Sequence, residues 1–319
     1  MSTMLVRLAA KAIEAENICR LELVPADGLA LPAFTAGAHI ELHLPGGPIR
    51  SYSLCNDPAE RHRYVLGILK DVNSRGGSRA VHEQLRVGDV LTIGVPRNHF
   101  ELDPEAGSSL LLGGGIGITP LLAMAEQLQR EKADFTLHYT ASRRERLAFA
   151  ERLAVAPYAG RVHIYLSQEH PGRRLDLDSL LAAPVAGRHL YVCGPQRFIN
   201  AVLASARSQG WDEACLHWEF FAGAQADASA DRSFELEIAS SGKVVQVPVG
   251  QTAVQVLLQA GIMVPVACEQ GVCGTCLTKV LAGTVDHRDL YLTPEEQAAG
   301  GQFLPCCSRA KSPRLVLDL

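Results

Sequence analysis

Four cysteines near the C-terminus place the strongest constraint on what this chain can fold into. Cys268, Cys273 and Cys276 form a C-x4-C-x2-C pattern, and Cys306 follows after 29 intervening residues. Four soft thiolate ligands suit an iron-sulfur core, and the small residues between them let backbone amides approach the sulfurs. Structural zinc is the alternative, but zinc favours paired C-x2-C or Cys/His knuckles. The spacing therefore predicts a 2Fe-2S cluster held by these four residues.

A fifth cysteine, Cys307, follows Cys306 directly and leaves one ligand open to question. Adjacent residues in an extended strand point to opposite faces, so only one of this pair can serve the cluster. The chain has nine cysteines, an odd number for a disulfide framework. The first twenty residues lack the apolar core of a signal peptide, because charged residues interrupt them. We therefore expect a cytoplasmic protein with reduced thiols.

Length and charge limit the number of domains and the kinds of partner that the chain can have. The 319 residues exceed the usual size of one hydrophobic core, so two or three domains are expected. The formal net charge of -4 gives no positive field for a nucleic acid. No stretch is long and apolar enough to span a bilayer. We expect neither a nucleic-acid nor a membrane partner, and we expect a monomer.

Hydrophobic periodicity divides the chain into two differently patterned parts followed by a third. Up to about residue 102, short alternating runs predict antiparallel strands in a small barrel, at 40–44, 49–54, 64–69 and 90–95. From about residue 107, apolar runs at 109–112, 135–139, 162–166 and 189–193 alternate with helical stretches near 120–130, 145–153 and 195–207. This βαβ pattern predicts a parallel sheet covered by helices.

The last part follows a stretch of small polar residues without periodicity, at 222–231, which is typical of a linker. A hairpin pattern over 234–247 and a helical stretch over 252–260 come next. The four clustered cysteines lie after this helix. The third part is therefore predicted to be a small α+β domain that carries the cluster.

A glycine-rich turn follows the first strand of the parallel sheet. The residues 110–120 read Leu-Leu-Leu-Gly-Gly-Gly-Ile-Gly-Ile-Thr-Pro, and glycines before a helix let backbone amides face a pyrophosphate. A tight strand-to-helix turn needs glycine anyway, so this run alone leaves ligand and turn equally open. The residues 191–195, Tyr-Val-Cys-Gly-Pro, end another strand of the sheet, where ligands of open parallel sheets bind.

Two stretches of the barrel carry polar groups where burial is expected. The first is Arg50-Ser-Tyr-Ser, and the second is Arg75-Gly-Gly-Ser, just before a helical stretch at 79–85. Glycine amides and a serine hydroxyl at a helix start form an anion site that suits a flavin phosphate. An ordinary polar turn is the alternative for either stretch taken alone.

Taken together, these motifs resemble one family. The stretch Ala267-Cys-Glu-Gln-Gly-Val-Cys-Gly-Thr-Cys resembles the cluster loop of plant-type ferredoxins, and the glycine loop with Tyr191–Pro195 resembles the nicotinamide domain of the ferredoxin-reductase superfamily. The whole chain is similar to the phthalate dioxygenase reductase and vanillate O-demethylase reductase family. The resemblance implies an antiparallel β-barrel flavin domain, a doubly wound α/β nicotinamide domain, a linker and a β-grasp ferredoxin domain, over residues 1–104, 105–224, 225–232 and 233–319.

The resemblance also implies residue roles. The flavin, FMN in this family, would contact the barrel residues Arg50, Ser51, Tyr52, Ser53, Ile68, Leu69, Lys70, Gly76, Gly77 and Ser78. The nicotinamide dinucleotide would contact Gly114, Gly115, Ile116, Gly117, Ser142, Arg143, Cys193, Gly194 and Pro195. Four residues would lie at the reacting rings: Ser53, Thr119 near flavin N5, Cys193, and Phe221 or its neighbour Phe220. The family register selects Cys306 as the fourth cluster ligand.

The implied activity is a reductase that takes hydride from NADH onto FMN and passes single electrons through the cluster to a Rieske-type oxygenase component. Arg143 or Arg144 would favour NADPH if either bound a 2′-phosphate, but a solvated helix start is the preferred explanation of both, and the resemblance implies NADH. One alternative activity is a stand-alone NADH-dependent reductase of a small acceptor such as a quinone. Another is a redox-sensing iron-sulfur flavoprotein.

Overall fold

The computed structural model describes residues 2–46, 49–71, 76–169, 174–182, 184–221, 231–266, 269–272 and 274–319. The chain forms two compact units, Met1–Phe221 and Ala222–Leu319. Most of the predicted linker, up to residue 230, lies outside the described residues. None of the helices in the described ranges is both long and apolar enough to cross a bilayer.

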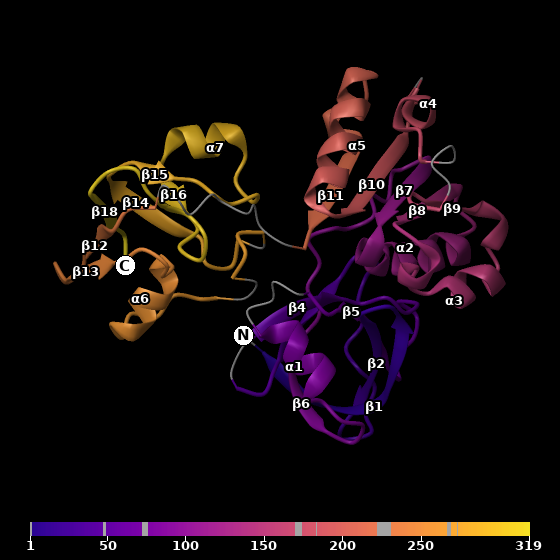
Figure 1. Ribbon diagram of the computed structural model, residues 1–319, viewed down its shortest axis with the longest axis horizontal. Helices are drawn as coiled ribbons and strands as arrows, with labels where there is room; N and C mark the ends of the chain where they lie inside the picture. Colours follow the sequence, from indigo (N-terminus) through magenta and orange to yellow (C-terminus); the bar gives the residue numbers. More distant parts are fainter. Residues whose placement is uncertain are drawn as a thin grey trace. The chain divides into compact units, whose positions relative to one another are not determined.

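The first lobe of the first unit is the predicted antiparallel barrel, called here the barrel lobe (Figure 1). Its six strands lie in the order β4-β3-β6-β1-β2-β5, with bounds β1 Thr3–Ala15, β2 Ile18–Pro25, β3 His39–His43, β4 Ile49–Ser53, β5 Tyr64–Leu69 and β6 Val90–Gly94. An antiparallel bridge between Leu54 and Leu66 joins the two edge strands. Closure removes the free strand edges that would otherwise pair with other chains. The short helix α1, Gly77–Glu83, follows β5.

The second lobe, called here the α/β lobe, is a five-stranded parallel sheet in the order β11-β10-β7-β8-β9. Its strands are β7 Ser108–Gly114, β8 Phe135–Ala141, β9 Val162–Leu166, β10 Arg188–Gly194 and β11 Leu216–Phe220. The chain builds β8 and β9 on one side of β7 and then returns to place β10 and β11 on the other. The order therefore reverses between β7 and β10, and ligands of such sheets bind at the carboxyl ends of these two strands.

Helices cover both faces of this sheet, as the doubly wound prediction requires. The helices are α2 Ile118–Glu131, α3 Ala150–Val155, α4 Leu177–Leu181 and α5 Gln196–Ser208. Leu110 and Leu112 of β7 pack in the core that contains α5, whereas Leu111 between them packs in the core that contains α2. Alternate residues of one buried strand thus serve two helical layers, which explains the continuous apolar run in the sequence.

One predicted helix is corrected by the structure. The stretch expected to be helical at 145–153 is divided into a single 3-10 turn, Arg144–Arg146, and α3, which begins at Ala150. Between them, Phe149 has a left-handed backbone with φ of 60°. The Phe149 N–H donates to the Glu14 carboxylate at 3.0 Å, and its ring packs over Gly67 of the barrel lobe. Contacts with the other lobe therefore interrupt a helix that local propensity favours.

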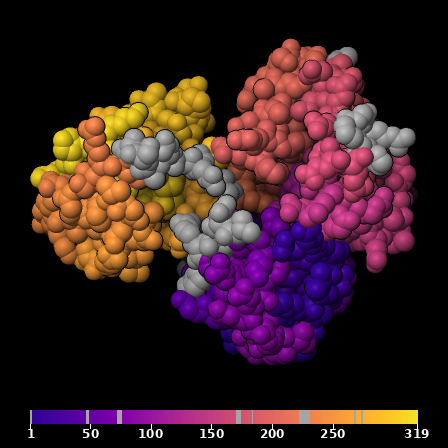
Figure 2. Space-filling model, viewed as in Figure 1, coloured from indigo at the N-terminus to yellow at the C-terminus, as the bar shows by residue number. Residues whose placement is uncertain are grey.

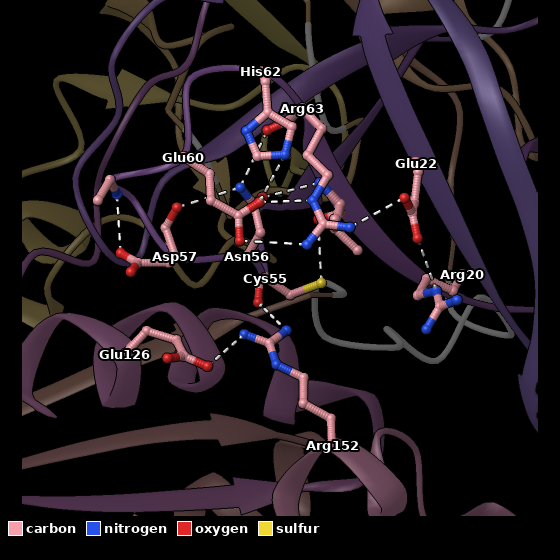
Figure 3. A network of polar contacts seen from close by, with 12 residues as sticks. Arg20, Glu22, Cys55, Asn56, Asp57, Glu60, His62, Arg63, Glu126 and Arg152 are labelled. Atoms are coloured by element: carbon pink, nitrogen blue, oxygen red, sulfur yellow. Dashed lines mark hydrogen bonds and ion pairs between the residues drawn. The ribbon is translucent and has the colours of Figure 1, made fainter. Parts of the chain in front are cut away.

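The two lobes of the first unit share one hydrophobic core, which contains residues from β1–β6 together with α2, α3 and β8. In Figure 2 the indigo and violet barrel lobe lies directly against the magenta part of the α/β lobe. Figure 3 shows the Arg152 guanidinium between the Glu126 carboxylate of α2 and the Cys55 carbonyl of the barrel lobe. The two hydrogen bonds measure 2.8 and 2.6 Å, and Glu126 also accepts from the Tyr158 hydroxyl.

The barrel loop that receives Arg152 is itself held by charged contacts (Figure 3). Arg63 donates to Glu60 at 2.6 Å and to Glu22 of β2 at 3.1 Å. The buried Asn56 accepts from the Val65 N–H at 2.9 Å. These contacts fix the loop after β4, so the carbonyl that Arg152 binds has a defined position.

The second unit is a mixed sheet in the order β13-β12-β18-β14-β16, with the parallel pair β12 and β18 adjacent. The strands are β12 Phe234–Ile238, β13 Val244–Val247, β14 Thr278–Ala282, β16 Gln302–Phe303 and β18 Arg314–Leu317, and β15 Val285–Asp286 pairs with β17 Arg309–Ala310. Helix α6, Ala253–Gln259, begins with a capping box of Thr252 and Gln255 and packs its apolar face on the sheet. Helix α7, Pro294–Ala299, precedes β16. This is the predicted α+β arrangement.

We expect Arg152→Met to destabilise the first unit by about 2–3 kcal/mol, because Glu126 would remain partly buried without its cation. Urea unfolding followed by circular dichroism measures this. The matched control is Arg207→Met, which removes an exposed ion pair with Glu213 and should change stability by less than about 1 kcal/mol. Equal losses in the two variants would contradict a special role for the contact between the lobes.

Candidate functional site

The glycine loop after β7 and the end of β10 touch through their backbones. A Cβ on Gly117 would lie 2.3 Å from the Cys193 carbonyl oxygen, and a Cβ on Gly194 would lie 2.9 Å from the Gly114 Cα. Gly115 also has a left-handed φ of 54°. Only glycine fits at these approaches.

This contact assembles the predicted nucleotide residues. Gly114, Gly115, Ile116 and Gly117 lead into α2, a helix of 14 residues, while Cys193, Gly194 and Pro195 lead from β10 into α5. Both segments leave the carboxyl ends of strands at the point where the strand order reverses. The N-terminus of α2 favours an anion such as a pyrophosphate.

Thr119 lies where this loop meets the barrel lobe. Its side chain is buried and its hydroxyl donates to the Ile116 carbonyl at 3.0 Å. A Cβ on Gly67 of β5 would lie 2.8 Å from the Thr119 methyl carbon. The first turn of α2 is thus in direct contact with the strand that also carries Ile68, one of the predicted flavin neighbours.

A second contact between the lobes brings Ser53 and Cys193 to a residue that the sequence analysis missed. Ser53 at the end of β4 donates to the Glu219 carboxylate of β11 at 3.4 Å. Glu219 is in register with Cys193 on the neighbouring strand. A charged residue in the middle of the apolar strand His217-Trp-Glu-Phe-Phe was the available signal.

The electrostatics of this group follow from its burial. Burial raises the pKa of Glu219 to about 8, against the smaller opposing effect of the Ser53 hydrogen bond. Burial, and then the nearby Glu219 carboxyl, raises the pKa of the Cys193 thiol well above its ordinary value. At neutral pH the end of β10 and β11 therefore presents a neutral thiol and a largely protonated carboxylic acid.

The two aromatic candidates pack differently. Phe221 packs against the core shared by the two lobes, and Phe220 packs against the core around α5. Phe198, which the sequence analysis did not single out, closes the site from α5, because a Cβ on Gly114 would lie 2.9 Å from its ring.

The barrel motifs also come together. A Cβ on Gly77 would lie 2.8 Å from Arg50 Cγ, so the arginine of the first motif lies across the glycine of the second. Gly76 has a left-handed φ of 96° directly before α1, and the Ser78 hydroxyl accepts from the Asp71 N–H. A cation next to the backbone amides at a helix start suits a terminal phosphate such as that of FMN.

Other predicted flavin residues vary in their surroundings. Burial raises the pKa of the Tyr52 phenol, and Ile68 is buried, whereas Leu69 is exposed. The Ser51 hydroxyl is buried and makes no hydrogen bond to any of the described residues. The Lys70 ammonium is already engaged within the chain, because it forms an ion pair with Glu83 at 2.9 Å.

The predicted ribose loop after β8 is held by the barrel lobe. Arg143 forms an ion pair with Glu16 in the turn after β1, and Arg146 lies 3.6 Å from the other oxygen of the same carboxylate. The Ser142 carbonyl accepts from the Gln168 N–H at 2.9 Å. Arg143 is therefore neutralised within the chain.

Two of the four predicted cluster ligands are described in the second unit. Cys276 and Cys306 are both 2% exposed, whereas Cys268 and Cys273 lie outside the described residues. The segment from Cys268 to Cys276 needs glycine at two left-handed positions, Gly271 and Gly274. A Cβ on Gly271 would lie 2.4 Å from the Cys307 sulfur, and one on Gly274 would lie 2.2 Å from the Tyr291 ring. Buried soft sulfurs under a close-packed glycine loop fit an iron-sulfur cluster.

Strand alternation does not distinguish Cys306 from Cys307, so that prediction is wrong. Both cysteines lie in a turn between β16 and β17 and not in an extended strand. Cys307 is more exposed and its thiol makes weak contacts of 3.7 Å with the Leu304 carbonyl and the Ser308 hydroxyl. The buried Asp289, which accepts from Ser308 and from the Leu292 N–H, organises the neighbouring loop and was not found from the sequence.

Comparison with known proteins agrees with this architecture. The family model described as 2Fe-2S iron-sulfur cluster binding domain matches residues 236–311, and the model described as dimethylamine monooxygenase subunit DmmA-like, N-terminal domain, matches residues 95–216. Vanillate O-demethylase oxidoreductase from Pseudomonas putida is 54% identical over 307 residues, which cover 96% of each chain. The chain belongs to the vanillate O-demethylase oxidoreductase family. The predicted iron-sulfur domain and the predicted family are both confirmed.

Other members of this family extend the comparison. Tetrachlorobenzoquinone reductase from Sphingobium chlorophenolicum is 43% identical over 308 residues, covering 96% of this chain and 94% of that protein. The solved structure of phthalate dioxygenase reductase superposes with a TM-score of 0.84 at 37% identity, covering 100% of this chain and 98% of that one. That structure is described as modular, for electron transfer from pyridine nucleotides to a 2Fe-2S centre. Both matches span the barrel lobe, the α/β lobe and the second unit.

We expect Cys306→Ser to lose the 2Fe-2S cluster and Cys307→Ser to keep it, because the Cys306 sulfur is the buried one of the pair. Iron analysis and the visible absorption of the purified variants measure this. The two substitutions are matched in size and differ by one position. A cluster that survives in Cys306→Ser and is lost in Cys307→Ser would reverse the assignment.

Glu219 should make stability depend on pH in a defined direction. Because its pKa is raised from 4.5 to about 8, the folded chain retains a proton that the unfolded chain has lost. This contribution is complete below the unfolded pKa and disappears as the pH rises through about 8. The melting temperature of the wild type should therefore fall relative to that of Glu219→Gln over this window. The exposed Glu105→Gln is the control, and wild-type and Glu219→Gln curves that stay parallel would contradict the assignment.

Proposed function

We propose that this chain is the reductase component of a Rieske-type oxygenase system, taking hydride from NADH onto FMN and passing single electrons through its 2Fe-2S cluster to an oxygenase component. One observation carries the proposal. The glycine loop and the end of β10 meet each other at the same place where Ser53 and Gly67 of the barrel lobe meet Glu219 and Thr119. A dinucleotide bound on the loop and a flavin bound along β4 and β5 would share this junction.

The chemistry of the bound groups is that of the cofactors: flavin takes two electrons as hydride and gives them up singly, and the 2Fe-2S cluster carries one at a time. The chain supplies position and electrostatics. Arg50 and the amides that begin α1 would hold the flavin phosphate. The backbone amides of Gly115–Gly117 and the first turn of α2 would hold the dinucleotide pyrophosphate.

The residues at the junction have distinct tasks in this proposal. Thr119 and Ser53 orient the reacting rings from opposite lobes, and Phe221 closes the pocket beside them. Cys193 and Glu219 remain uncharged at neutral pH, so they place no negative charge beside a ring that receives hydride. A protonated Glu219 can also donate a hydrogen bond to a carboxamide oxygen.

NADH is the proposed donor because of the Arg143 ion pair. A 2′-phosphate bound by Arg143 would have to displace the Glu16 carboxylate, which also lies near Arg146. Displacement would leave Glu16 close to a dianionic phosphate, which is unfavourable. The adenosine ribose hydroxyl of NADH imposes no such cost.

The proposed acceptor is an oxygenase component that acts on aromatic compounds, since vanillate O-demethylase and phthalate dioxygenase name the activities of two relatives. A second candidate is reduction of a small quinone, which the relative named tetrachlorobenzoquinone reductase favours. The candidates differ in whether the cluster is needed. Quinones can take electrons directly from a reduced flavin, whereas an oxygenase receives them from the cluster.

The test uses the purified holoprotein with NADH and the oxygenase component of a vanillate O-demethylase. We expect NADH to bleach both the flavin and cluster bands without oxygen, and vanillate turnover to require this chain. Cys306→Ser should abolish vanillate turnover and retain reduction of a small quinone, and Cys307→Ser should retain both. Vanillate turnover that survives loss of the cluster, or quinone reduction with no turnover in the wild type, would reject the oxygenase proposal.

A further inference from the structure

Two histidines and an aspartate gather at the amino ends of β10 and β11, away from the nucleotide loops. Asp103 belongs to the segment that joins β6 to β7, His189 is the second residue of β10, and His217 is the second residue of β11. One ligand atom from each lies within 4.8 Å of the others. Among the described residues this is the one such group of three potential metal ligands.

The interatomic distances are close to those of a metal site. His189 Nδ1 lies 2.9 Å from His217 Nε2 and 3.7 Å from Asp103 Oδ2. Two imidazole nitrogens on one tetrahedral zinc ion lie about 3.3 Å apart. To share an ion, the two nitrogens would separate by about 0.4 Å, and the two rings, which are nearly parallel with centroids 5.2 Å apart, would rotate so that both nitrogens point at the ion. The donor set, two imidazoles and a carboxylate, suits divalent first-row transition metals.

Neighbouring groups hold the three side chains in place. The Tyr191 ring stacks on His217 with centroids 4.5 Å apart, and its hydroxyl accepts from the Asp103 N–H at 2.8 Å. Asp103 Oδ1 accepts from the Glu105 N–H at 2.8 Å. Oδ2 is then the carboxylate oxygen that faces His189. Such supporting contacts are what orient the ligands of a metal site.

Burial and access are also compatible with binding. The His189 side chain is 11% exposed and that of Asp103 is 34% exposed. An ion can therefore enter beside the carboxylate and retain water there.

The cluster is separate from the hydride-transfer junction. His189 and Cys193 lie four residues apart on one strand, which is about 13 Å. An ion bound by Asp103, His189 and His217 would not touch the reacting rings. It would tie the segment that connects the two lobes to two strands of the parallel sheet.

We propose that Asp103, His189 and His217 form a binding site for a divalent transition-metal ion of the Zn²⁺ type, which braces the connection between the barrel lobe and the α/β lobe. The alternative is a simple hydrogen-bonded histidine pair. Another histidine pair, His138 and His163, is stacked with centroids 4.7 Å apart on β8 and β9 and belongs to no three-ligand group within the described ranges. It supplies the matched control.

The experiment is equilibrium dialysis of the full-length holoprotein against Zn²⁺, with zinc and iron counted in the same sample. Wild type should bind about one zinc ion per chain more than His217→Gln. Asp103→Asn keeps the acceptor for Glu105 but removes the charge, and should weaken this binding at least about tenfold. His163→Gln should match the wild type. Constant iron content shows that the cluster and its thiols are unchanged, and Mg²⁺ should not compete because it prefers oxygen ligands.

The outcomes distinguish a metal site from a simple hydrogen-bonded histidine pair. Loss of one zinc equivalent in His217→Gln, with His163→Gln unaffected, supports the site. Equal zinc binding by wild type, His217→Gln and Asp103→Asn would overturn it, as would equal losses in His217→Gln and His163→Gln. A rise in melting temperature on adding Zn²⁺ should appear in the wild type and be absent from Asp103→Asn, which tests the bracing role independently of the count.

Discussion

The approach of two backbones, at Gly117 and the Cys193 carbonyl, is the constraint on which the site depends. With no side chain between them, the loop after β7 and the end of β10 form one continuous surface at the point where the strand order reverses. The first turn of α2 follows immediately and contacts Gly67 of the barrel lobe through Thr119. A nucleotide surface and a flavin strand can share one junction only because glycine occupies both of these approaches, at Gly117 and at Gly67.

Much of the fold follows from the sequence because its signals are local. Alternating runs such as 40–44 and 64–69 mark strands whose faces differ in exposure, and the buried runs of the α/β lobe mark strands covered on both sides. The backbone conformation of Phe149 cannot be predicted from local sequence patterns. Its left-handed backbone is held by Glu14 and by packing over Gly67, two partners more than 80 residues away in the chain, and no local pattern reports them.

The candidate site likewise has features that the sequence shows and features that only the folded chain creates. The cysteine spacing and the glycine loop are contiguous motifs, so the sequence shows them directly. Glu219 acquires its character only when β11 is placed beside β10 and Ser53 arrives from the other lobe. Asp103, His189 and His217 likewise come from three separate segments, and their proximity is set by sheet order. Chemistry made by tertiary contact is not visible in spacing.

The common core beneath the barrel and α/β lobes has a consequence for protein engineering. Residues of both lobes bury one another, and Arg152 and Phe149 reach from one into the other. A hybrid enzyme that exchanged the α/β lobe alone would expose apolar surface, and it would remove the Arg152 donor from the Cys55 carbonyl and the Phe149 N–H from Glu14. The unit that evolution or a designer can transplant whole is therefore the entire segment Met1–Phe221, and donor preference is better altered by point substitutions inside it.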